Sequence, residues 1–227
     1  MIRAILSLCL LLFIVSCQSK TDQPSEDTND SSNTDELSVA ETIAYKNGLE
    51  NWDEVTEIDF TFNVDRGGNH FERSWKWNPT THDVTLMTSS DTIRYNRKQV
   101  DSLTLQADSG FINDSYWLLA PFKLVWDEGT SFSEVTKELA PISQDTLNKI
   151  TLTYGDEGGY TPGDAYDLFY DSKFILREWI FRKGNAPSPS MITTFEDYEK
   201  YEGLNIAKMH KDSTGTFQLY FTNISVR

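Results

Sequence analysis

Apolar and polar residues alternate one by one along much of this chain. Residues 58–64 read IDFTFNV, and residues 71–77 read FERSWKW. Successive side chains of a β-strand point to opposite faces of a sheet, so this period of two predicts strands with one apolar face and one polar face. The stretch DRGGN at 65–69 lies between them and is rich in turn-forming residues. The two strands are therefore expected to form a hairpin.

The pattern continues to the end of the sequence. Further strands are predicted at 84–87, 92–95, 150–154, 166–170, 175–181, 191–195, 204–210 and 217–226. A strand with one polar face lies between water and a core. The expected fold is therefore mainly β, a curved antiparallel sheet or half-open β-barrel of about nine to ten strands.

Two helices are expected beside this sheet, as a lid or plug on its concave face. Residues 37–49 carry an apolar stripe at helical spacing, with Gly48 at the end, where a C-terminal cap belongs. Residues 114–119 form the second predicted helix, with Asp114 as its N-cap and Pro121 limiting its length.

The N-terminus has the layout of a secretory signal. Arg3 supplies a positive start, residues 4–15 are apolar, and Ser16 precedes Cys17. Residues 14–17 read IVSC and resemble a bacterial lipobox, which implies a signal peptide over 1–16 and a lipid on Cys17. The alternatives are a signal with an incidental cysteine, and a transmembrane helix. The apolar run of about twelve residues is short for a helix that spans a membrane, which needs roughly twenty.

Residues 17–36 are interpreted as the lipidated cysteine and a disordered acidic tether, because QSKTDQPSEDTNDSSNTDE offers nothing to a core. Residues 37–227 are then a single β-rich globular domain. By the lipoprotein sorting rule, Gln18 in place of Asp favours the outer membrane. The predicted location is the cell envelope, lipid-anchored to the outer membrane, on either its periplasmic face or the cell surface.

Charge and cysteine content limit the partners. The formal net charge of -15 argues against a nucleic-acid partner, and the membrane is expected to be reached through the lipid on Cys17. Cys9 and Cys17 are the two cysteines, and Cys9 lies in the predicted signal. We therefore expect no disulfide in the domain. No cofactor and no metal site are predicted.

Motifs that carry chemistry are scarce. The three histidines, His70, His82 and His210, lie in no H-E-x-x-H pattern, and such histidines are expected at the surface. The sequence has no G-x-S-x-G elbow and no P-loop. Glu178 is expected on the wet face of its strand. The chain is predicted not to be an enzyme. A hydrolase acting on envelope glycan or lipid stays an alternative, because a catalytic carboxylate pair is defined by its separation in space.

Two stretches resemble a known family. Residues 39–64 combine a helix, Gly48, Trp52 and an alternating strand, and residues 113–129 read NDSYWLLAPFKLVWDEG. They resemble envelope lipoproteins similar in layout to the lipoprotein-sorting carrier and its outer-membrane receptor, the Lol-type half-barrel superfamily. The resemblance implies a half-open β-barrel with a helical lid over an apolar cavity for acyl chains. It assigns no binding residue.

The aromatic residues offer candidates for such a cavity. The candidate lining residues come from adjacent predicted strands and from the predicted second helix: Phe60, Phe62, Trp75, Trp77, Trp117 and Leu118. The sequence thus predicts a lipid-anchored binding module with an apolar cavity for a lipid or lipoprotein ligand. The main alternative is a structural or interaction lipoprotein with a filled core, since aromatics also favour strands for packing. A stacking platform for sugar rings is a further alternative.

Overall fold

The computed structural model describes residues 36–157 and 161–227. The predicted signal peptide, Cys17 and the predicted tether up to residue 35 lie outside the described residues. Residues Glu36–Arg227 form one unit. Within the described part of the chain, no helix is both long enough and apolar enough to cross a membrane.

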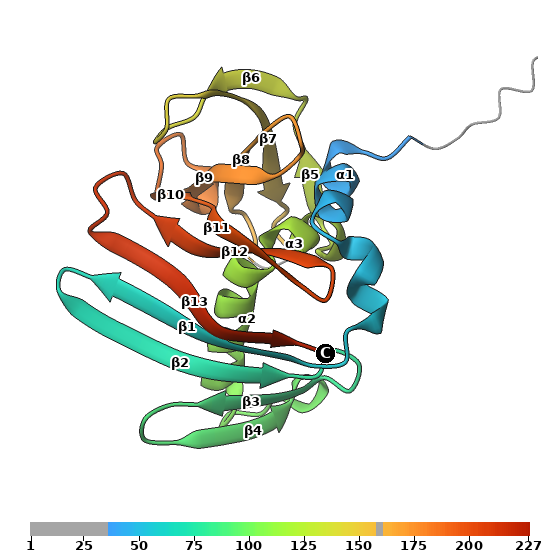
Figure 1. The fold of residues 1–227 in the computed structure, drawn as a ribbon, viewed down its shortest axis with the longest axis vertical. Helices are drawn as coiled ribbons and strands as arrows, with labels where there is room; N and C mark the ends of the chain where they lie inside the picture. Colours follow the sequence, from blue (N-terminus) through green and yellow to red (C-terminus); the bar gives the residue numbers. More distant parts are fainter. Residues whose placement is uncertain (1–35, 158–160) are drawn as a thin grey trace, which may run out of the picture. The chain divides into compact units, whose positions relative to one another are not determined.

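The strands of this unit form two antiparallel sheets (Figure 1). The seven-stranded sheet has the order β11 (Glu196–Tyr201), β12 (Leu204–Lys211), β13 (Phe217–Val226), β1 (Ile58–Arg66), β2 (Asn69–Trp77), β3 (Asp83–Met87) and β4 (Thr92–Asn96). The six-stranded sheet has the order β10 (Met191–Thr194), β9 (Leu176–Arg182), β8 (Ala165–Tyr170), β7 (Thr146–Tyr154) and β5 (Thr130–Phe132), and β6 (Thr136–Leu139) also pairs with β7.

The predicted hairpin is β1 and β2. Phe60 lies opposite Trp75 in the ladder, and the turn contains Gly67 and Gly68, both with positive φ. Positive φ at two successive turn residues favours glycine and matches the twist of a hairpin. The alternation in the sequence therefore gave the correct pairing for these two strands.

The mainly β, open antiparallel fold predicted from the sequence is confirmed, with a difference in its layout. The strands divide between two sheets instead of forming one curved sheet. The chain passes from β10 to β11 through a single residue, Phe195, which is buried. The crossing contains no glycine or proline. The sequence therefore carries no turn signal that would predict the change from one sheet to the other. The short strands β5, β6 and β11 carry no clear alternation and were not predicted.

Helix α1 (Val39–Lys46) and the 3-10 helix η1 (Leu49–Glu54) replace the single helix predicted over 37–49. Ser38 and Glu41 form a capping box, in which the Ser38 hydroxyl accepts from the Glu41 amide and the Glu41 carboxylate accepts from the Ser38 amide. Gly48, at φ 99°, separates the two helices. A Cβ at Gly48 would overlap the carbonyl of Gly203, so glycine is required there for both conformation and space.

The second helical region is longer than predicted. It consists of α2 (Leu105–Leu118) and α3 (Ala120–Trp126), preceded by the 3-10 helix η2 (Arg97–Gln99). A third 3-10 helix, η3 (Lys183–Asn185), follows β9. The prediction that Asp114 caps a helix is wrong, because Asp114 lies inside α2 and is fully buried. Its carboxylate accepts hydrogen bonds from Arg73 Nε at 2.6 Å and from Trp75 Nε1 at 2.7 Å.

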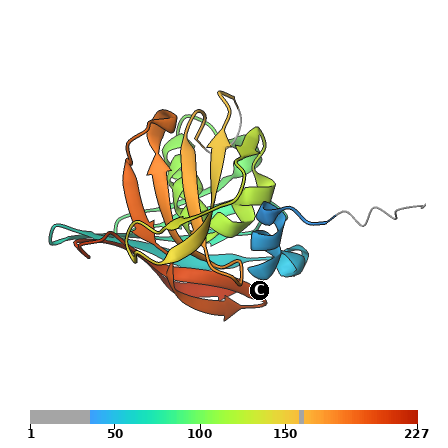
Figure 2. The same cartoon turned by 90° about the horizontal axis from the view of Figure 1, so that it is seen from above.

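Helix α2 packs against both sheets (Figure 2). On one side, the Phe111 ring contacts the ring of Trp75 on β2, with 5.5 Å between centroids. On the other side, the Tyr116 ring contacts the ring of Tyr166 on β8, with 5.4 Å between centroids. The core therefore has two parts, one on each side of α2. This placement of α2 positions the candidate site.

Candidate functional site

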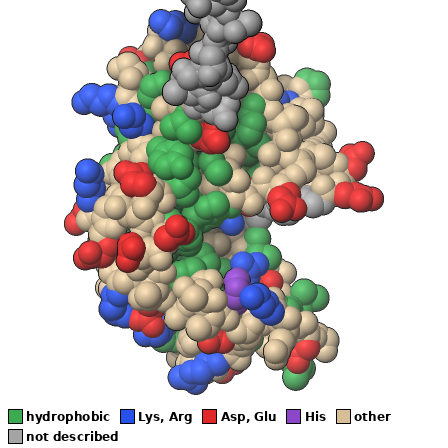
Figure 3. Space-filling view, turned by 90° about the vertical axis from the view of Figure 1, so that its right-hand side faces the viewer, with side chains coloured by type: hydrophobic (Ala, Val, Ile, Leu, Met, Phe, Trp, Pro, Cys, Tyr) green, Lys and Arg blue, Asp and Glu red, His purple; other side chains and the backbone are tan. Residues whose placement is uncertain are grey.

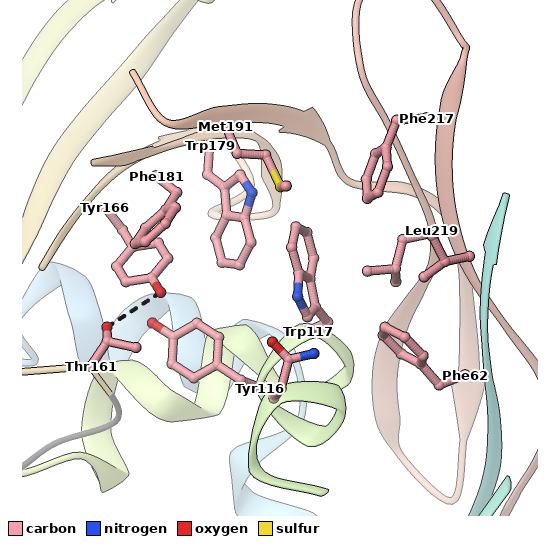
Figure 4. A pocket seen from close by; sticks show the side chains of 12 residues that line it. Phe62, Tyr116, Trp117, Thr161, Tyr166, Trp179, Phe181, Met191, Phe217 and Leu219 are labelled. Carbon is pink, nitrogen blue, oxygen red and sulfur yellow. Dashed lines mark hydrogen bonds between the residues drawn. The ribbon is translucent and has the colours of Figure 1, made fainter. Parts of the chain in front are cut away.

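An apolar cavity of about 350 Å³ lies between α2 and the two sheets (Figure 4). Strands of both sheets, α2 and the loop before β8 contribute to its wall. The lining residues are Phe62, Val64, Asn113, Tyr116, Trp117, Thr161, Tyr166, Trp179, Phe181, Met191, Phe217 and Leu219.

Strand register brings these side chains together. In the seven-stranded sheet, Val64 lies directly opposite Leu219, and Phe62 lies two residues away on the same face of β1. In the six-stranded sheet, Phe181 lies opposite Tyr166 on one side and opposite Met191 on the other. Each wall is thus a set of neighbouring residues on one face of a sheet. The alternation of apolar and polar residues in the sequence places them on that face.

The aromatic rings contact one another around the cavity. Trp117 of α2 meets Trp179 edge to face, with 4.5 Å between centroids. Tyr166 contacts Phe181 at 5.0 Å. Figure 4 shows Trp117 between two groups of side chains, with Tyr166 and Phe181 in one group and Phe62 in the other. Trp117 therefore adjoins both walls of the cavity.

The lining carries no charged side chain among the described residues. Its polar groups include the side chains of Asn113 and Thr161, the tyrosine hydroxyls and the indole N–H groups of Trp117 and Trp179. The Tyr116 hydroxyl lies 3.0 Å from that of Tyr154, which donates to Asp127 Oδ2 at 2.7 Å. Burial raises the pKa of Tyr116 well above its ordinary value, so the phenol stays neutral. The cavity thus offers an uncharged, mainly aromatic surface with a few hydroxyl groups.

The six residues predicted to line a cavity occupy three different places. Phe62 and Trp117 lie on the cavity wall. Phe60, Trp75 and Leu118 lie in the packed core, each at most 2% exposed. Trp77 lines a second pocket, described below. Alternation placed the four strand residues on one sheet face and the other two on the covering segment, but it does not tell which of them are enclosed in the core and which reach the cavity.

The lining residues from β8, β9 and β10 were missed. Tyr166, Trp179 and Phe181 do alternate along their strands, so a signal existed for their shared face. Alternation along a strand does not predict that a second sheet faces the first across α2. Met191, the first residue of β10, belongs to the same wall, and no sequence pattern pointed to it as a lining residue.

The prediction that His210 lies at the surface is wrong. His210 is fully buried, with Nδ1 3.0 Å from the Thr194 carbonyl oxygen. Its ring contacts Phe195 at 4.6 Å and Trp117 at 5.2 Å between centroids. Burial among these rings lowers the pKa of His210 to about 4, because an aromatic environment cannot solvate the imidazolium. His210 is therefore a neutral core residue behind Trp117.

The expectation that Glu178 faces water is also wrong. Glu178 is 2% exposed, and its carboxylate accepts from the amides of Ile142 at 2.7 Å and Ser143 at 2.8 Å. These bonds compensate the buried charge and fix the turn before β7. Its carboxylate therefore has a structural role in holding that turn.

The other two histidines lie nearer the surface. His70 is exposed and pairs with Asp65 at 2.7 Å, and His82 lines the second pocket. In the described ranges, 36–157 and 161–227, no group of three or more His, Cys, Asp and Glu side chains is placed to hold a metal ion.

No family model matches this sequence, and no curated protein matches it either. Several solved structures do. A LolA superfamily protein from Nitrosomonas europaea is similar with a TM-score of 0.47 and 10% identity, over 84% of this chain and 94% of that chain. A domain described as an outer membrane lipoprotein-sorting protein, from Vibrio parahaemolyticus, has a TM-score of 0.48 and 10% identity, over 83% and 91%.

A DUF1329 family protein from Desulfovibrio piger is similar with a TM-score of 0.46 and 10% identity, over 83% of this chain and 91% of that chain. The likeness is one of fold. Two of these three structures are described as LolA superfamily or lipoprotein-sorting proteins, and the sequence was found to resemble that superfamily. Because identities are 10% and TM-scores lie below 0.5, nothing about a ligand of this chain follows from them.

Proposed function

We propose that residues 36–227 form a non-enzymatic binding domain that takes an acyl chain of a lipid or lipoprotein into the cavity between α2 and the sheets. The observation that supports this most is the lining itself, which is aromatic and aliphatic and carries no charge among the described residues. Apolar pockets with a few polar groups are the usual form of small-molecule sites.

The size of the cavity fits one chain. Ligand pockets have volumes of about 300–1,000 Å³, and this one, at about 350 Å³, lies at the small end. It has room for part of a single acyl chain. Burying such a chain contributes about 25 cal/mol for each Å² of apolar surface removed from water. A charged guest would lose its hydration here and find no countercharge on the wall.

The proposal includes the location of the protein. Cys17 is the proposed lipid attachment site, and the proposed place is the outer membrane, where residues 18–36 would connect the anchor to the domain. This part rests on the sequence pattern IVSC at 14–17. One acyl chain gives only marginal membrane binding, so two or three chains on Cys17 are expected.

Binding of a fluorescent fatty-acid analogue to the purified domain tests the proposal. We expect saturable binding by the unmodified domain, competed by unlabelled fatty acid. Trp117→Ala and Phe62→Ala should each weaken binding by about tenfold, because each removes part of the wall. Trp77→Ala is the matched control, since Trp77 is half-buried and outside this cavity.

Truncating a buried aromatic also costs stability, about 3–5 kcal/mol when it is fully buried. Binding is therefore compared only among variants whose thermal unfolding remains cooperative and whose circular dichroism is unchanged. Absence of binding to the folded, unmodified domain would contradict the proposal. So would equal losses in Trp77→Ala and Trp117→Ala, because the probe would then not distinguish the cavity from the second pocket.

A further inference from the structure

A second pocket, of about 280 Å³, lies at a different place on the domain. Figure 3 shows a hollow on this side of the molecule, with hydrophobic side chains within it and a histidine and basic side chains at its edge. The residues that line the pocket come from η1, β2, the β2–β3 turn, η2, α2, the α2–α3 junction and α3: Trp52, Trp77, Pro79, His82, Arg97, Phe111, Ser115, Leu119, Lys123 and Trp126.

Three indole rings from separate elements meet in this pocket. Trp52 contacts Trp126 with 4.4 Å between ring centroids and contacts Trp77 with 5.6 Å. All three side chains are only partly buried, so each leaves ring surface at the pocket. Neighbouring indole faces give a rigid apolar surface for a flat or ring-shaped guest.

The charged residues of the pocket are basic. Arg97 and Lys123 line it together with His82, and no Asp or Glu is among its lining residues. The chain as a whole carries a net charge of -15, so the positive charge of the pocket lining is opposite in sign to the charge of the protein. A site of this sign favours a negatively charged ligand.

Lys123 has an incomplete ion pair. Its nearest carboxylate is that of Asp127, with Nζ 3.8 Å from Oδ1, and Asp127 also accepts the Tyr154 hydroxyl through Oδ2. Burial lowers the pKa of Lys123, the carboxylate of Asp127 opposes this shift, and the positive charge of Arg97 adds to it. Arg97 is held by Asp108 at 2.9 Å. An anion placed between these two cations would relieve their repulsion and add charge-assisted hydrogen bonds.

We propose that this second pocket binds a sugar ring that carries a carboxylate or a phosphate. The ring would lie against the indoles of Trp52 and Trp126, and its anionic group would meet Lys123 and Arg97. This ligand differs from the acyl chain of the cavity in charge and in shape. The two sites share no lining residue, so the inference does not depend on the proposed function.

Calorimetric titration of the folded domain at low ionic strength tests this site. The probes are glucuronate and glucose 1-phosphate, and glucose is the neutral control. We expect saturable binding of both anionic sugars and at least tenfold weaker binding of glucose. Vesicles containing a glucuronosyl diacylglycerol, compared with neutral vesicles, show whether the same group is also recognised as a lipid headgroup.

Lys123→Gln should weaken binding of the anionic sugars by about tenfold or more, since a hydrogen bond to a charged group is lost. Lys98→Gln is the matched control, because Lys98 lies exposed on η2 beside Arg97 and does not line the pocket. Equal binding of glucose and glucuronate, no binding of either anionic sugar, or equal affinities in the two variants would overturn the inference. The comparison of glucose with glucuronate uses the unmodified domain. It therefore tests the inference even if Lys123→Gln does not fold.

Discussion

At the scale of single residues, His210 is a neutral imidazole in an aromatic core. The pKa of its side chain falls from an ordinary value of 6.5 to about 4 in the folded protein, because burial penalises the charged form. Between these two values the unfolded chain binds the proton and the folded chain does not. The free energy of unfolding therefore decreases as the pH falls from about 6.5 to about 4.

His210→Phe should remove this part of the pH dependence, because the new ring cannot be protonated. Each pKa unit corresponds to about 1.4 kcal/mol. Between pH 6.5 and pH 4, the free energy of unfolding of the wild type should therefore fall by on the order of 3 kcal/mol more than that of the variant. The measurement is urea unfolding at a series of pH values. Parallel pH profiles for the two proteins would show that His210 is not neutral in the fold.

His70 provides a contrast of opposite sign. Its hydrogen bond with Asp65 raises the pKa of the exposed imidazole, so this contact stabilises the fold at low pH and the effect is lost as the pH rises through the folded pKa. His70→Gln should therefore leave the loss between pH 6.5 and 4 in place. Because His70 is exposed, the change should be small.

At the scale of elements, α2 is joined to β2 by a buried ion pair. Asp114 is fully buried, Arg73 donates to it through Nε and Nη2, and the side chain of Arg73 is 22% exposed. Removing one partner of such a pair leaves an uncompensated buried charge, which costs about 3–5 kcal/mol in a fully buried pair. The partial exposure of Arg73 reduces that cost.

Arg73→Gln should lower the free energy of unfolding by about 2–4 kcal/mol. Arg177→Gln is the matched control, because Arg177 pairs with Asp171 at 2.6 Å but its side chain is 46% exposed. We expect that control to cost less than about 1 kcal/mol. Equal losses in urea unfolding would mean that the pair on α2 does not hold this helix to the sheet.

The elements also show how far the sequence predicts the fold. The hairpin of β1 and β2 follows from alternation and from Gly67–Gly68, which are local signals. The extent of α2 does not, because the helix reads LQADSGFINDSYWL, in which the polar residues Asp108 and Asp114 are buried. Their ion pairs come from residues 11 and 41 positions away. A local pattern cannot contain such long-range compensation.

The candidate site follows the same division. Alternation placed Phe62 on an apolar face, and the apolar run around Trp117 indicated a covering segment. Tyr166, Trp179 and Phe181 were missed, because their role depends on a second sheet that faces the first across α2. Phe60 and Phe62 share a face of one strand, yet Phe60 is packed in the core and Phe62 reaches the cavity.

At the scale of the whole molecule, the core lies in the described domain, and the proposed anchor lies outside the described residues. Residues 36–227 contain both parts of the core, so Cys17→Ala should yield a folded, soluble protein with the unfolding temperature of the unanchored domain. Membrane fractionation with a radiolabelled fatty acid measures the anchor itself. Labelling that persists in the variant would show that Cys17 is not the attachment site.

The central claim for the whole molecule is that an acyl chain enters the cavity between α2 and the two sheets. Photo-crosslinking with a fatty acid that carries a diazirine on its chain, followed by peptide mapping, tests it most directly. The account predicts adducts on lining residues from α2 and from both sheets, such as Trp117, Phe181 and Leu219, and their loss when unlabelled fatty acid is in excess. Adducts confined to the exposed surface, or to the second pocket around Trp52 and Trp126, would contradict it.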